Sequence, residues 1–566
     1  MKTFVKTARR TKRGLPPGGA DSLPQSKTGG LWRRIVMNKW VYMHKLFALL
    51  LAGMMALTLL SGCGGDVSQP ASAPAASSGA QDTQNAEPLH FTYLRGVWGP
   101  ATYTPDGYYA EYLRENANVD IEVQIIPIVE YDAKVKTIVA SGSLPDMLMA
   151  SGPVDPYWKD LENQGAFTPL EEYLEKYPAL KELADDSIWE MLRNEDGHIY
   201  FLPRTLVAET PFMIYYRQDY FEELGIEEPT TVAELEAALE KIKAEMPDVT
   251  PMAVGNGGTA WMGKDLATAF GATIGGWVPA EDGSIVPDYL DPKTLDYVFW
   301  LQDMKARGLL DADAEVNPDF SAGQQKFKIG TAAVLLENAN LFADIYSNLT
   351  ANDPDAKIGF ISPLTGPNGD KGGTNVYFPM DRGYYIAATA ENVDRMMEYL
   401  NWTLTEGTDF RLYGIEGKTY TREADGTIKL IPESEQEPGY ESSQKEPLLF
   451  ANRPEEDFNW ENYERSFASV GAEDYLELFK QTWDEHCANK YYTYKNPTVF
   501  SETNNEIGAQ LAESYLNAYW TAGIITNPAI TREEFEGVVQ EYLAAGGQTI
   551  IDEFNEGQPD KSKPTY

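Results

Sequence analysis

Cysteine is nearly absent from this chain. Among 566 residues only Cys63 and Cys487 are cysteines, so no framework of disulfide bonds can hold the fold together. Basic residues are also scarce, since 46 Lys and Arg stand against 86 Asp and Glu, a formal net charge of −40. Such a charge repels nucleic acid and anionic membrane surfaces, so we expect neither as a partner of the folded part. The composition is otherwise that of a globular protein with roughly two to four domains.

Motifs for phosphate binding, metal binding and hydrolysis are missing as well. The chain has no G-x-x-x-x-G-K-[ST], no H-E-x-x-H and no G-x-S-x-G. One glycine-rich segment opens like a phosphate loop, but Ala260 stands where the last glycine is required, and a calcium-like loop fails at Val316 for the same reason. Only three histidines lie beyond the signal region, and no ligand spacing surrounds His486. We therefore expect no metal and no cofactor, and we interpret Cys487 as a buried thiol.

The segment 1–62 differs from the rest of the chain. It holds 11 Lys and Arg and one acid, which, subtracted from the totals, leaves 35 basic and 85 acidic residues, a net charge of −50. The apolar run Leu46–Leu60 is shorter than the roughly 20 residues that a membrane span needs. A basic flank before this run is typical of a secretory signal. Leu60-Ser-Gly-Cys63 resembles the lipobox of bacterial lipoproteins, which implies cleavage before Cys63 and acylation of that residue.

Two features frame this signal. Residues 1–36 make an unusually long preface, and a start at Met37 or Met43 would give a typical signal, so we expect a misassigned start codon. Residues 63–88 are rich in Ser, Ala, Gln and Pro and contain few large apolar side chains. Such a segment cannot bury enough surface to order itself, so we expect a flexible tether between a lipid anchor and the folded body.

The body opens with alternating strand and helix patterns. Strands are predicted at 89–94, 121–125 and 146–150 from their apolar alternation, with helices at 107–116 and 131–140 between them. This order predicts an α/β fold with a parallel sheet covered by helices. Ligands of such sheets bind beyond the carboxyl ends of the strands, which draws attention to Trp98 and to the segment 141–146.

Two later helices have recognisable start signals. Thr231–Glu234 and Thr531–Glu534 are capping boxes, in which a hydroxyl and a carboxylate satisfy free backbone N–H groups at the start of a helix. Gly546 and Gly547 are expected to end the second of these helices. The density of Gly, Asn and Pro from 366 to 374 predicts a surface loop.

Several short motifs occur together in a specific order. They are Ala140–Asp146 with a small–Gly–x–x–Pro-Asp pattern, Ile199–Arg204, Phe212–Arg217, Asp219–Gly225, the turn Pro229–Thr231 and the Gly-x-Glu-Gly element within Tyr413–Tyr420. Asp219 completes an Arg–x–Asp step that begins at Arg217. In this order, and with the lipobox, the chain resembles the extracellular solute-binding proteins of ABC importers over nearly all of residues 63–560. The Gly-x-Glu-Gly element resembles one found in a Gram-positive branch of these lipoproteins that is tied to oligosaccharide import.

The resemblance implies a two-lobed periplasmic-binding-protein-like (type II) α/β fold with an interlobe cleft. Residues 89–210 would begin the first lobe, 211–380 would form the second, and 381–566 would return to the first and add C-terminal helices on both. The crossings between lobes are expected near 204–215 and 377–386. The resemblance further implies a monomer, not an enzyme, that is lipid-anchored on the extracellular face of the cell membrane and passes its ligand to ABC permease subunits.

The expected ligand is a carbohydrate, because sugars combine an apolar face that stacks on aromatic rings with hydroxyls that need planar polar partners. The candidate residues are those near strand ends or glycine-rich loops: Trp98, Tyr103, Asp146, Arg204, Trp261, Trp277, Asn338, Arg382, Tyr384 and Trp460. A peptide or another small solute is the alternative ligand, since aromatic clefts accept peptides too. A sensor or adhesin on the same fold and a secreted glycan hydrolase remain open, because 86 acids could supply a carboxylate pair.

Overall fold

The computed structural model describes the folded body of the chain. The described residues are 87–98, 101–151, 155–194, 196–205, 209–255, 259–280, 282–314, 322–376, 380–450, 459–493, 501–516 and 522–557. The predicted signal and Cys63 lie outside these ranges. Within the described ranges, no helix is both long enough and apolar enough to cross a bilayer.

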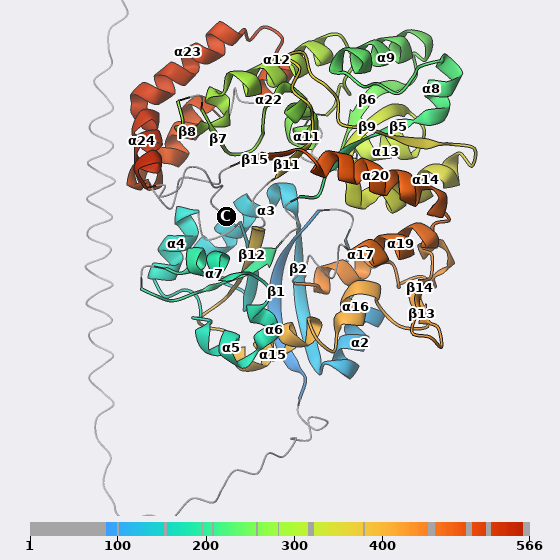
Figure 1. The fold of residues 1–566 in the computed structure, drawn as a ribbon. Coiled ribbons are helices and arrows are strands. Elements are labelled where there is room, and N and C mark those ends of the chain that lie inside the picture. The colour runs from blue at the N-terminus through green and yellow to red at the C-terminus, as the bar shows by residue number, and fades with distance from the viewer. Residues whose placement is uncertain are drawn as a thin grey trace, which may run out of the picture. The chain divides into compact units, whose positions relative to one another are not determined.

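The first sheet has five strands in the order β2-β1-β3-β12-β4 (Figure 1). These are β1 (Leu89–Val97), β2 (Val119–Pro127), β3 (Met147–Ala150), β4 (Phe201–Thr205) and β12 (Met380–Ile386). β1 pairs in parallel with β2 and β3, whereas β12 runs antiparallel to β3 and β4. The three predicted strands and their parallel pairing are confirmed. The antiparallel β12 lies within the return crossing expected near 377–386, but its pairing was not predicted, because its partners lie far earlier in the chain.

Helices surround this sheet and supply its core. They are α2 (Tyr108–Asn116), α3 (Ile128–Ala140), α4 (Pro156–Asn163), α5 (Glu171–Lys176), α6 (Pro178–Lys181), α7 (Asp186–Leu192), α15 (Val393–Thr403) and α16 (Thr408–Tyr413). Each contributes apolar side chains to one continuous cluster, which we call the first core. The sheet and these helices form the first lobe.

The second sheet has four strands in the order β10-β5-β9-β6. These are β5 (Phe212–Arg217), β6 (Thr250–Val254), β9 (Ala332–Asn338) and β10 (Ile358–Ile361). β6 and β9 are parallel, and β5 is antiparallel to both of its neighbours. β5 is buried on both faces, so Ile214 and Tyr216 enter one core while Met213 and Tyr215 enter another.

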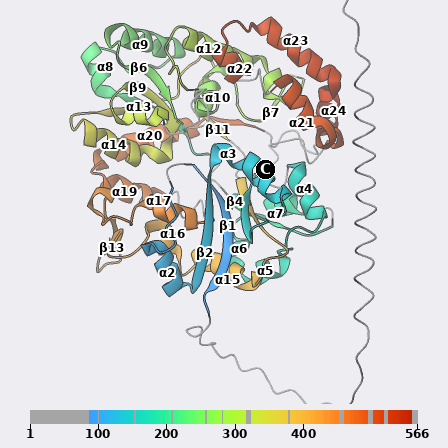
Figure 2. The same cartoon turned by 180° about the vertical axis from the view of Figure 1, so that it is seen from behind.

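Two groups of helices cover the faces of the second sheet and complete the second lobe (Figures 1 and 2). On the second core lie α8 (Gln218–Leu224), α9 (Val232–Glu245), α10 (Thr259–Met262), α11 (Lys264–Ala267), α12 (Pro292–Ala306), α21 (Ala509–Leu511), α22 (Ala522–Thr526), α23 (Arg532–Tyr542) and α24 (Gln548–Gly557). On the third core lie α13 (Ala322–Lys328), α14 (Phe342–Asn352), α19 (Trp460–Ser469) and α20 (Leu476–Cys487).

Both predicted capping boxes are present. Thr231 and Glu234 form one at the start of α9, and Thr531 and Glu534 form the other at the start of α23. The α-helix α23 ends at Tyr542, shortly before Gly546, whose φ of 138° breaks the helical path before α24 begins. The glycine therefore marks a bend between two helices, where a side chain would be strained.

Short elements complete the two lobes. The strands are β7 (Trp277–Pro279) paired with β8 (Ile285–Pro287), β13 (Tyr420–Arg422) paired with β14 (Ile428–Leu430), and β11 (Thr374–Val376) paired in parallel with β15 (Lys490–Tyr492). The single-turn elements η3 (Asp288–Leu290) and η4 (Ala339–Leu341) precede α12 and α14, and α17 (Ser442–Lys445) follows the β13–β14 hairpin.

Two segments connect the sheets. The chain leaves the first sheet after β4 and enters the second at β5, and it returns from β11 to β12. Because β4 is parallel to β3 and β12 is antiparallel to it, both segments meet the first sheet at the edge where β1 and β3 end. β5 begins where β6 and β9 end, since it is antiparallel to β9. The connections therefore join the carboxyl edges of the two sheets, the position at which such sheets bind ligands.

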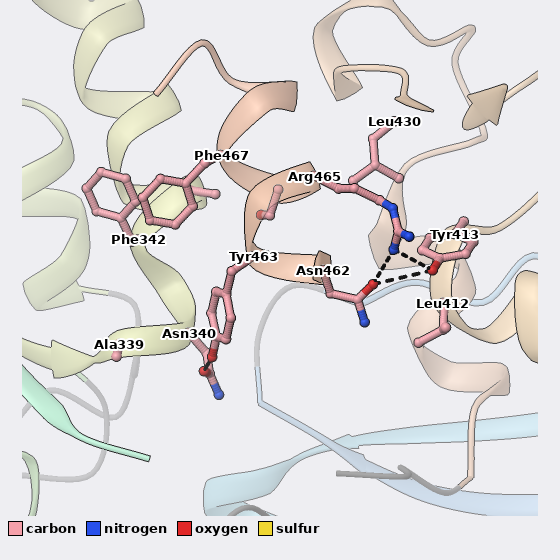
Figure 3. A pocket seen from close by; sticks show the side chains of 12 residues that line it. Ala339, Asn340, Phe342, Leu412, Tyr413, Leu430, Asn462, Tyr463, Arg465 and Phe467 are labelled. Carbon is pink, nitrogen blue, oxygen red and sulfur yellow. Dashed lines mark hydrogen bonds between the residues drawn. The ribbon is translucent and has the colours of Figure 1, made fainter. Parts of the chain in front are cut away.

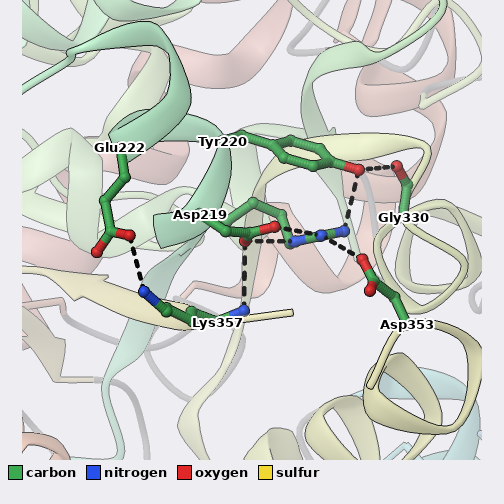
Figure 4. A network of polar contacts seen from close by, with 7 residues as sticks. Asp219, Tyr220, Glu222, Gly330, Asp353 and Lys357 are labelled. Atoms are coloured by element: carbon green, nitrogen blue, oxygen red, sulfur yellow. Dashed lines mark hydrogen bonds and ion pairs between the residues drawn. The ribbon is translucent and has the colours of Figure 1, made fainter. Parts of the chain in front are cut away.

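The Arg–x–Asp motif has a structural role at the opposite edge of the second sheet (Figure 4). Arg217 is fully buried at the end of β5, and its Nε and Nη2 donate to the carboxylate of Asp219 at 2.9 and 2.6 Å. Nη2 also pairs with Asp353 at 2.7 Å, and Nη1 donates to the hydroxyl of Tyr220, which donates to the carbonyl of Gly330. One buried guanidinium thus connects the start of α8 with Asp353 after α14 and, through Tyr220, with the turn at Gly330.

Candidate functional site

Trp98 and Arg204 meet at the carboxyl edge of the first sheet. Trp98 follows β1 directly, Arg204 lies on β4, and the guanidinium carbon of Arg204 sits 4.5 Å from the centre of the indole ring. The strands β3 and β12 lie between β1 and β4 in the sheet, so the two long side chains reach toward each other over the strand ends. Both are only partly buried. A stacked tryptophan and arginine form a flat platform of the kind on which a sugar ring can rest.

Arg382 lies at the same edge. It is near the start of β12, and its two terminal nitrogens donate to the carboxylate of Asp132 on α3 at 2.8 and 3.3 Å. The side chain of Arg382 is 15% exposed and that of Asp132 is 48% exposed, so the carboxylate is the more solvent-exposed partner of the pair. The structure therefore brings three of the ten predicted ligand-binding residues, Trp98, Arg204 and Arg382, to one edge.

Two further predicted residues lie at the carboxyl edge of the second sheet. Asn338 ends β9, but its side-chain oxygen accepts a hydrogen bond from the backbone N–H of Asn340 at 2.9 Å and so caps η4. Trp261 lies on α10, partly buried against the second core, with the ammonium of Lys264 at 5.1 Å from its ring. The glycines before Trp261, at 257 and 258, lie outside the described residues.

A cavity of about 210 Å³ opens beside Asn338 between parts of both lobes (Figure 3). Its lining residues are Ala339, Asn340, Phe342, Ala343, Leu412, Tyr413, Leu430, Asn462, Tyr463, Arg465, Ser466 and Phe467. The residues from η4, α14 and α19 belong to the second lobe, because Phe342 and Phe467 are buried in the third core. Tyr413 comes from α16, which packs on the first core through Phe410. We call this space the interlobe pocket.

Polar side chains line one side of the interlobe pocket. Nη1 of Arg465 donates to the hydroxyl of Tyr413 at 2.9 Å and to the side-chain oxygen of Asn462 at 2.6 Å. The other terminal nitrogen of Arg465 pairs with Glu461, and the hydroxyl of Tyr463 donates to the side chain of Asn340. Aromatic rings and planar hydrogen-bonding groups therefore share one cavity (Figure 3). This combination suits a ligand with apolar faces and hydroxyl edges.

Sequence reasoning missed the pocket-lining side chains themselves. Asn338 and Trp460 were predicted and stand close in sequence to Asn340 and Asn462, but their own side chains are used elsewhere. The ring of Trp460 packs with those of Tyr463, Phe479 and Trp483 beside the third core. Tyr413 opens the Gly-x-Glu-Gly element, and that motif was the one available signal for this part of the site.

Four other predicted residues serve the fold. Tyr384 is fully buried in the first core and its hydroxyl accepts from Arg95 at 3.2 Å. Trp277 is buried against Phe554, with ring centres 4.5 Å apart. A ring enclosed by protein cannot stack on a ligand, so we leave Tyr384 and Trp277 out of the candidate site.

The polar members of this group are equally engaged. Asp146 accepts from the backbone N–H and the hydroxyl of Thr92 at 2.8 and 2.7 Å, which fixes the loop before β3 to β1. The hydroxyl of Tyr103 donates to the backbone carbonyl of Ile121 on β2. These hydrogen bonds account for the positions of Asp146 and Tyr103, so no contact with a ligand is needed to explain them.

A buried carboxylate holds both connections between the sheets. Asp265 accepts from the backbone N–H of Phe212 at 2.9 Å, where β5 begins, and from the N–H of Asn375 at 2.9 Å, just before the return to β12. Burial raises the pKa of Asp265, and the neighbouring Lys264 opposes that rise. Burial also lowers the pKa of Lys264 to about 7 and lowers the pKa of His486, whose Nδ1 lies 3.8 Å from Asp265.

The remaining chemistry-bearing groups have ordinary surroundings. Cys487 is half-buried, its thiol donates to the carbonyl of Glu209 at 3.4 Å, and burial raises its pKa to about 12, so it is not a reactive thiolate. Asp311 pairs with Lys326 at 2.5 Å. Within the described part of the chain, no three His, Cys, Asp or Glu side chains are grouped to hold a metal ion.

A second cavity, of about 620 Å³, lies in the second lobe. It is bounded by the β7–β8 hairpin, the start of α12 and β15, and its walls include Val278, Pro279, Tyr491 and Tyr492. Its two cations are both paired with carboxylates. Lys490 contacts Glu209 at 2.7 Å, and Lys293 contacts Asp370 at 3.7 Å.

Comparisons with known proteins agree with this architecture. A family model described as bacterial extracellular solute-binding protein matches residues 100–409, more than half of the chain. Lipoprotein LipO of Bacillus subtilis (strain 168) is 24% identical over 475 residues, which span 78% of this chain and 87% of that protein. The polygalacturonan/rhamnogalacturonan-binding protein YtcQ of the same organism is 20% identical over 458 residues, or 78% of this chain and 85% of that protein.

The solved structures give the same result for the fold. The ABC-transporter substrate-binding protein FusA of S. pneumoniae in complex with kestose aligns with a TM-score of 0.58 at 19% identity, covering 82% of this chain and 96% of that one. The two-lobed α/β architecture expected from the sequence is confirmed.

Proposed function

Because the chain belongs to the family of bacterial extracellular solute-binding proteins, we propose that it captures an oligosaccharide between its two lobes and delivers it to the permease of an ABC importer. Sugar ligands are named for two of the similar proteins, YtcQ and FusA. A receptor of this kind needs complementary walls on two lobes and connections that allow the lobes to close. It performs no chemistry on the ligand.

One observation carries the proposal. The interlobe pocket is lined by Tyr413 of the first lobe and by Asn340 and Tyr463 of the second, and Arg465 of the second lobe donates to the hydroxyl of Tyr413. A ligand in this space contacts both lobes at once, so its binding free energy favours the conformation in which the lobes approach each other. Aromatic rings supply apolar area and the amide and guanidinium groups supply hydrogen bonds, which together match a sugar ring.

The proposal also includes residues at the carboxyl edges of the two sheets. We include Trp98, Arg204 and Arg382 from the first sheet and Trp261 from the second as candidate contacts for further sugar units. All four are partly buried side chains at strand ends or on the helix after a strand end, and none is enclosed in a core. An oligosaccharide longer than one unit would use several of them.

The proposal also includes a place for the protein. We propose that Cys63 is acylated and that the mature chain is tethered by residues 63–88 to the extracellular face of the cell membrane as a monomer. The lipobox supports this anchor, and the name of the similar LipO, a lipoprotein, is consistent with it.

Isothermal titration calorimetry of the purified protein against a panel of neutral and acidic oligosaccharides, peptides and amino acids tests the function. We expect stoichiometric binding of an oligosaccharide that chromatography recovers unchanged. Tyr413→Phe should weaken that binding by about two- to tenfold, because it removes the hydroxyl that orients Arg465. Tyr346→Phe on α14, a tyrosine that does not line the pocket, is the matched control.

Other outcomes assign other functions. Binding of peptides in place of sugars would make the protein a peptide receptor of the same fold. Turnover of a glycan, lost on replacement of a single Asp or Glu, would make it a hydrolase.

A further inference from the structure

Four cations described above, Arg465, Arg382, Lys490 and Lys293, are paired with carboxylates of the protein, and the guanidinium of Arg204 is stacked on Trp98. On this basis, and resting on the proposed function, we infer that the ligand is an uncharged oligosaccharide and that chains containing uronic acids are disfavoured. A sugar carboxylate is held tightly only where a guanidinium or ammonium offers charge and hydrogen bonds that the protein itself does not use. Whether the site offers such a cation depends on how its charged residues are paired.

Arg465 is the cation of the interlobe pocket. Both of its terminal nitrogens are engaged, one with Tyr413 and Asn462 and the other with the carboxylate of Glu461. Its side chain is 17% exposed, whereas that of Glu461 is 72% exposed. A uronate that approached Arg465 would exchange one carboxylate partner for another, and Glu461 would stay within a few ångströms and repel it. The exchange therefore contributes little to binding.

Cations outside the interlobe pocket follow the same pattern. Arg382 is paired with Asp132 through two hydrogen bonds. In the second cavity Lys490 is paired with Glu209 and Lys293 with Asp370. Each pair brings its own negative charge to the site, so the local charge is close to zero at each cation.

The other polar groups that line the interlobe pocket are uncharged. Asn340 and Asn462 carry amides, and Tyr413 and Tyr463 carry aromatic rings with hydroxyls, which hydrogen-bond to one another or to Arg465 as neutral groups. These groups match the hydroxyls and C–H faces of a neutral sugar. The residues after the signal carry 35 basic and 85 acidic side chains, once 11 and one are subtracted from the totals of 46 and 86, and this excess repels a polyanion before it reaches the site.

Matched ligands test this inference directly. Calorimetry at low salt compares neutral oligosaccharides with oligouronates, including trigalacturonate against its methyl ester, which keeps the ring and removes the charge. We expect neutral oligosaccharides to bind, and each charged ligand to bind at least about tenfold more weakly than its uncharged counterpart. A charged ligand that binds as tightly as its neutral counterpart, or more tightly, overturns the inference and leaves the proposed function intact. If no carbohydrate binds, the proposed function fails, and the inference with it.

A variant gives the inference a second test. Glu461→Gln removes the carboxylate that pairs with Arg465 and lies on the surface, so folding should be unaffected. We expect its affinity for the uronates to rise several-fold while its affinity for neutral sugars changes little. Glu464→Gln, which breaks the pair with Lys480 on the neighbouring helix α20, is the control and should change neither affinity. Equal uronate affinities of the Glu461→Gln variant and the unmodified protein contradict the inference.

Discussion

The guanidinium of Arg204 stacks on the ring of Trp98, 4.5 Å from its centre, across the end of the first sheet. The two residues are far apart in the sequence, and neither is enclosed by the core. Stacking holds the indole in one orientation, so a ligand that binds to the other face of the ring loses little binding free energy in ordering the side chain. This pair gives the first lobe a prepared surface at the edge that faces the connections to the second lobe.

Replacing the tryptophans at the two edges should reduce affinity more than stability. Trp98→Ala and Trp261→Ala each remove part of a ring's apolar contact, worth about 25 cal/mol per Å², so sugar binding should weaken by about tenfold or more. The melting temperature of the unliganded protein should change little. Calorimetry and thermal unfolding of the same samples measure the two quantities.

A core tryptophan provides the contrast. Trp158 is fully buried in the first core, so Trp158→Phe should lower the melting temperature and leave affinity almost unchanged. If Trp98→Ala or Trp261→Ala behaved like Trp158→Phe, that residue would belong to the core and not to the site.

Asp265 should be among the most important polar residues for stability. The two carboxylate oxygens of Asp265 accept from the backbone N–H groups of Phe212 and Asn375. Asp265→Asn replaces one of these oxygens with an NH₂ group, which cannot accept a hydrogen bond. The variant should therefore lose about 2–4 kcal/mol of unfolding free energy. Urea unfolding measures this loss. The surface variant Asp296→Asn, which breaks the exposed pair with Arg532, should cost less than about 1 kcal/mol. Equal losses for the two variants would contradict the role of Asp265 in holding both connections.

Asp288 should make stability depend on pH. Burial raises its pKa to about 6, against the opposing effect of backbone N–H groups such as that of Gly275. Between about pH 4 and pH 6 the folded state keeps a proton that the unfolded state releases, so this group's contribution to stability falls as pH rises and levels off above pH 6. Asp288→Asn mimics the protonated form. Its unfolding free energy relative to the unmodified protein should therefore increase by up to about 3 kcal/mol from pH 4 to pH 7.

Chemical unfolding of both proteins at several pH values checks this prediction, because the titration of all other groups cancels in the difference. A difference that stays constant over this range would show that Asp288 titrates as an exposed carboxyl does.

The anchor depends on one side chain. Cys63→Ala removes the thiol that would be acylated, so the protein should move from the membrane fraction to soluble or unprocessed forms. Detergent partitioning and metabolic labelling with a fatty acid measure this change. Unchanged partitioning of the variant would exclude lipid anchoring at Cys63, and Cys487→Ala is the control, because its thiol lies in the folded body.

Part of the site could be predicted because strand ends are visible in the sequence. Trp98 was found from its position after a predicted strand, and Arg382 lies in the crossing expected near 377–386 from the family resemblance; both lie at the carboxyl edge. Tyr384 was predicted as well and shares a strand and a face with Arg382, but it is fully buried. Two residues along a strand correspond to about 6.6 Å, and this distance separates the solvent-facing end of β12 from its fully buried middle. Sequence patterns indicate which face is apolar but not how deep a residue lies.

Local rules therefore determined much of this chain by themselves. Apolar alternation predicted β1, β2 and β3, and both capping boxes formed as written, because each of these features depends on residues a few positions apart. The interlobe pocket was decided by tertiary structure alone. It joins Asn340, Tyr413 and Arg465, which lie on three elements far apart in the sequence and belong to both lobes. Only the packing of α16 on the first core and of α19 on the third brings these side chains to one cavity, and no periodicity in the sequence records that meeting.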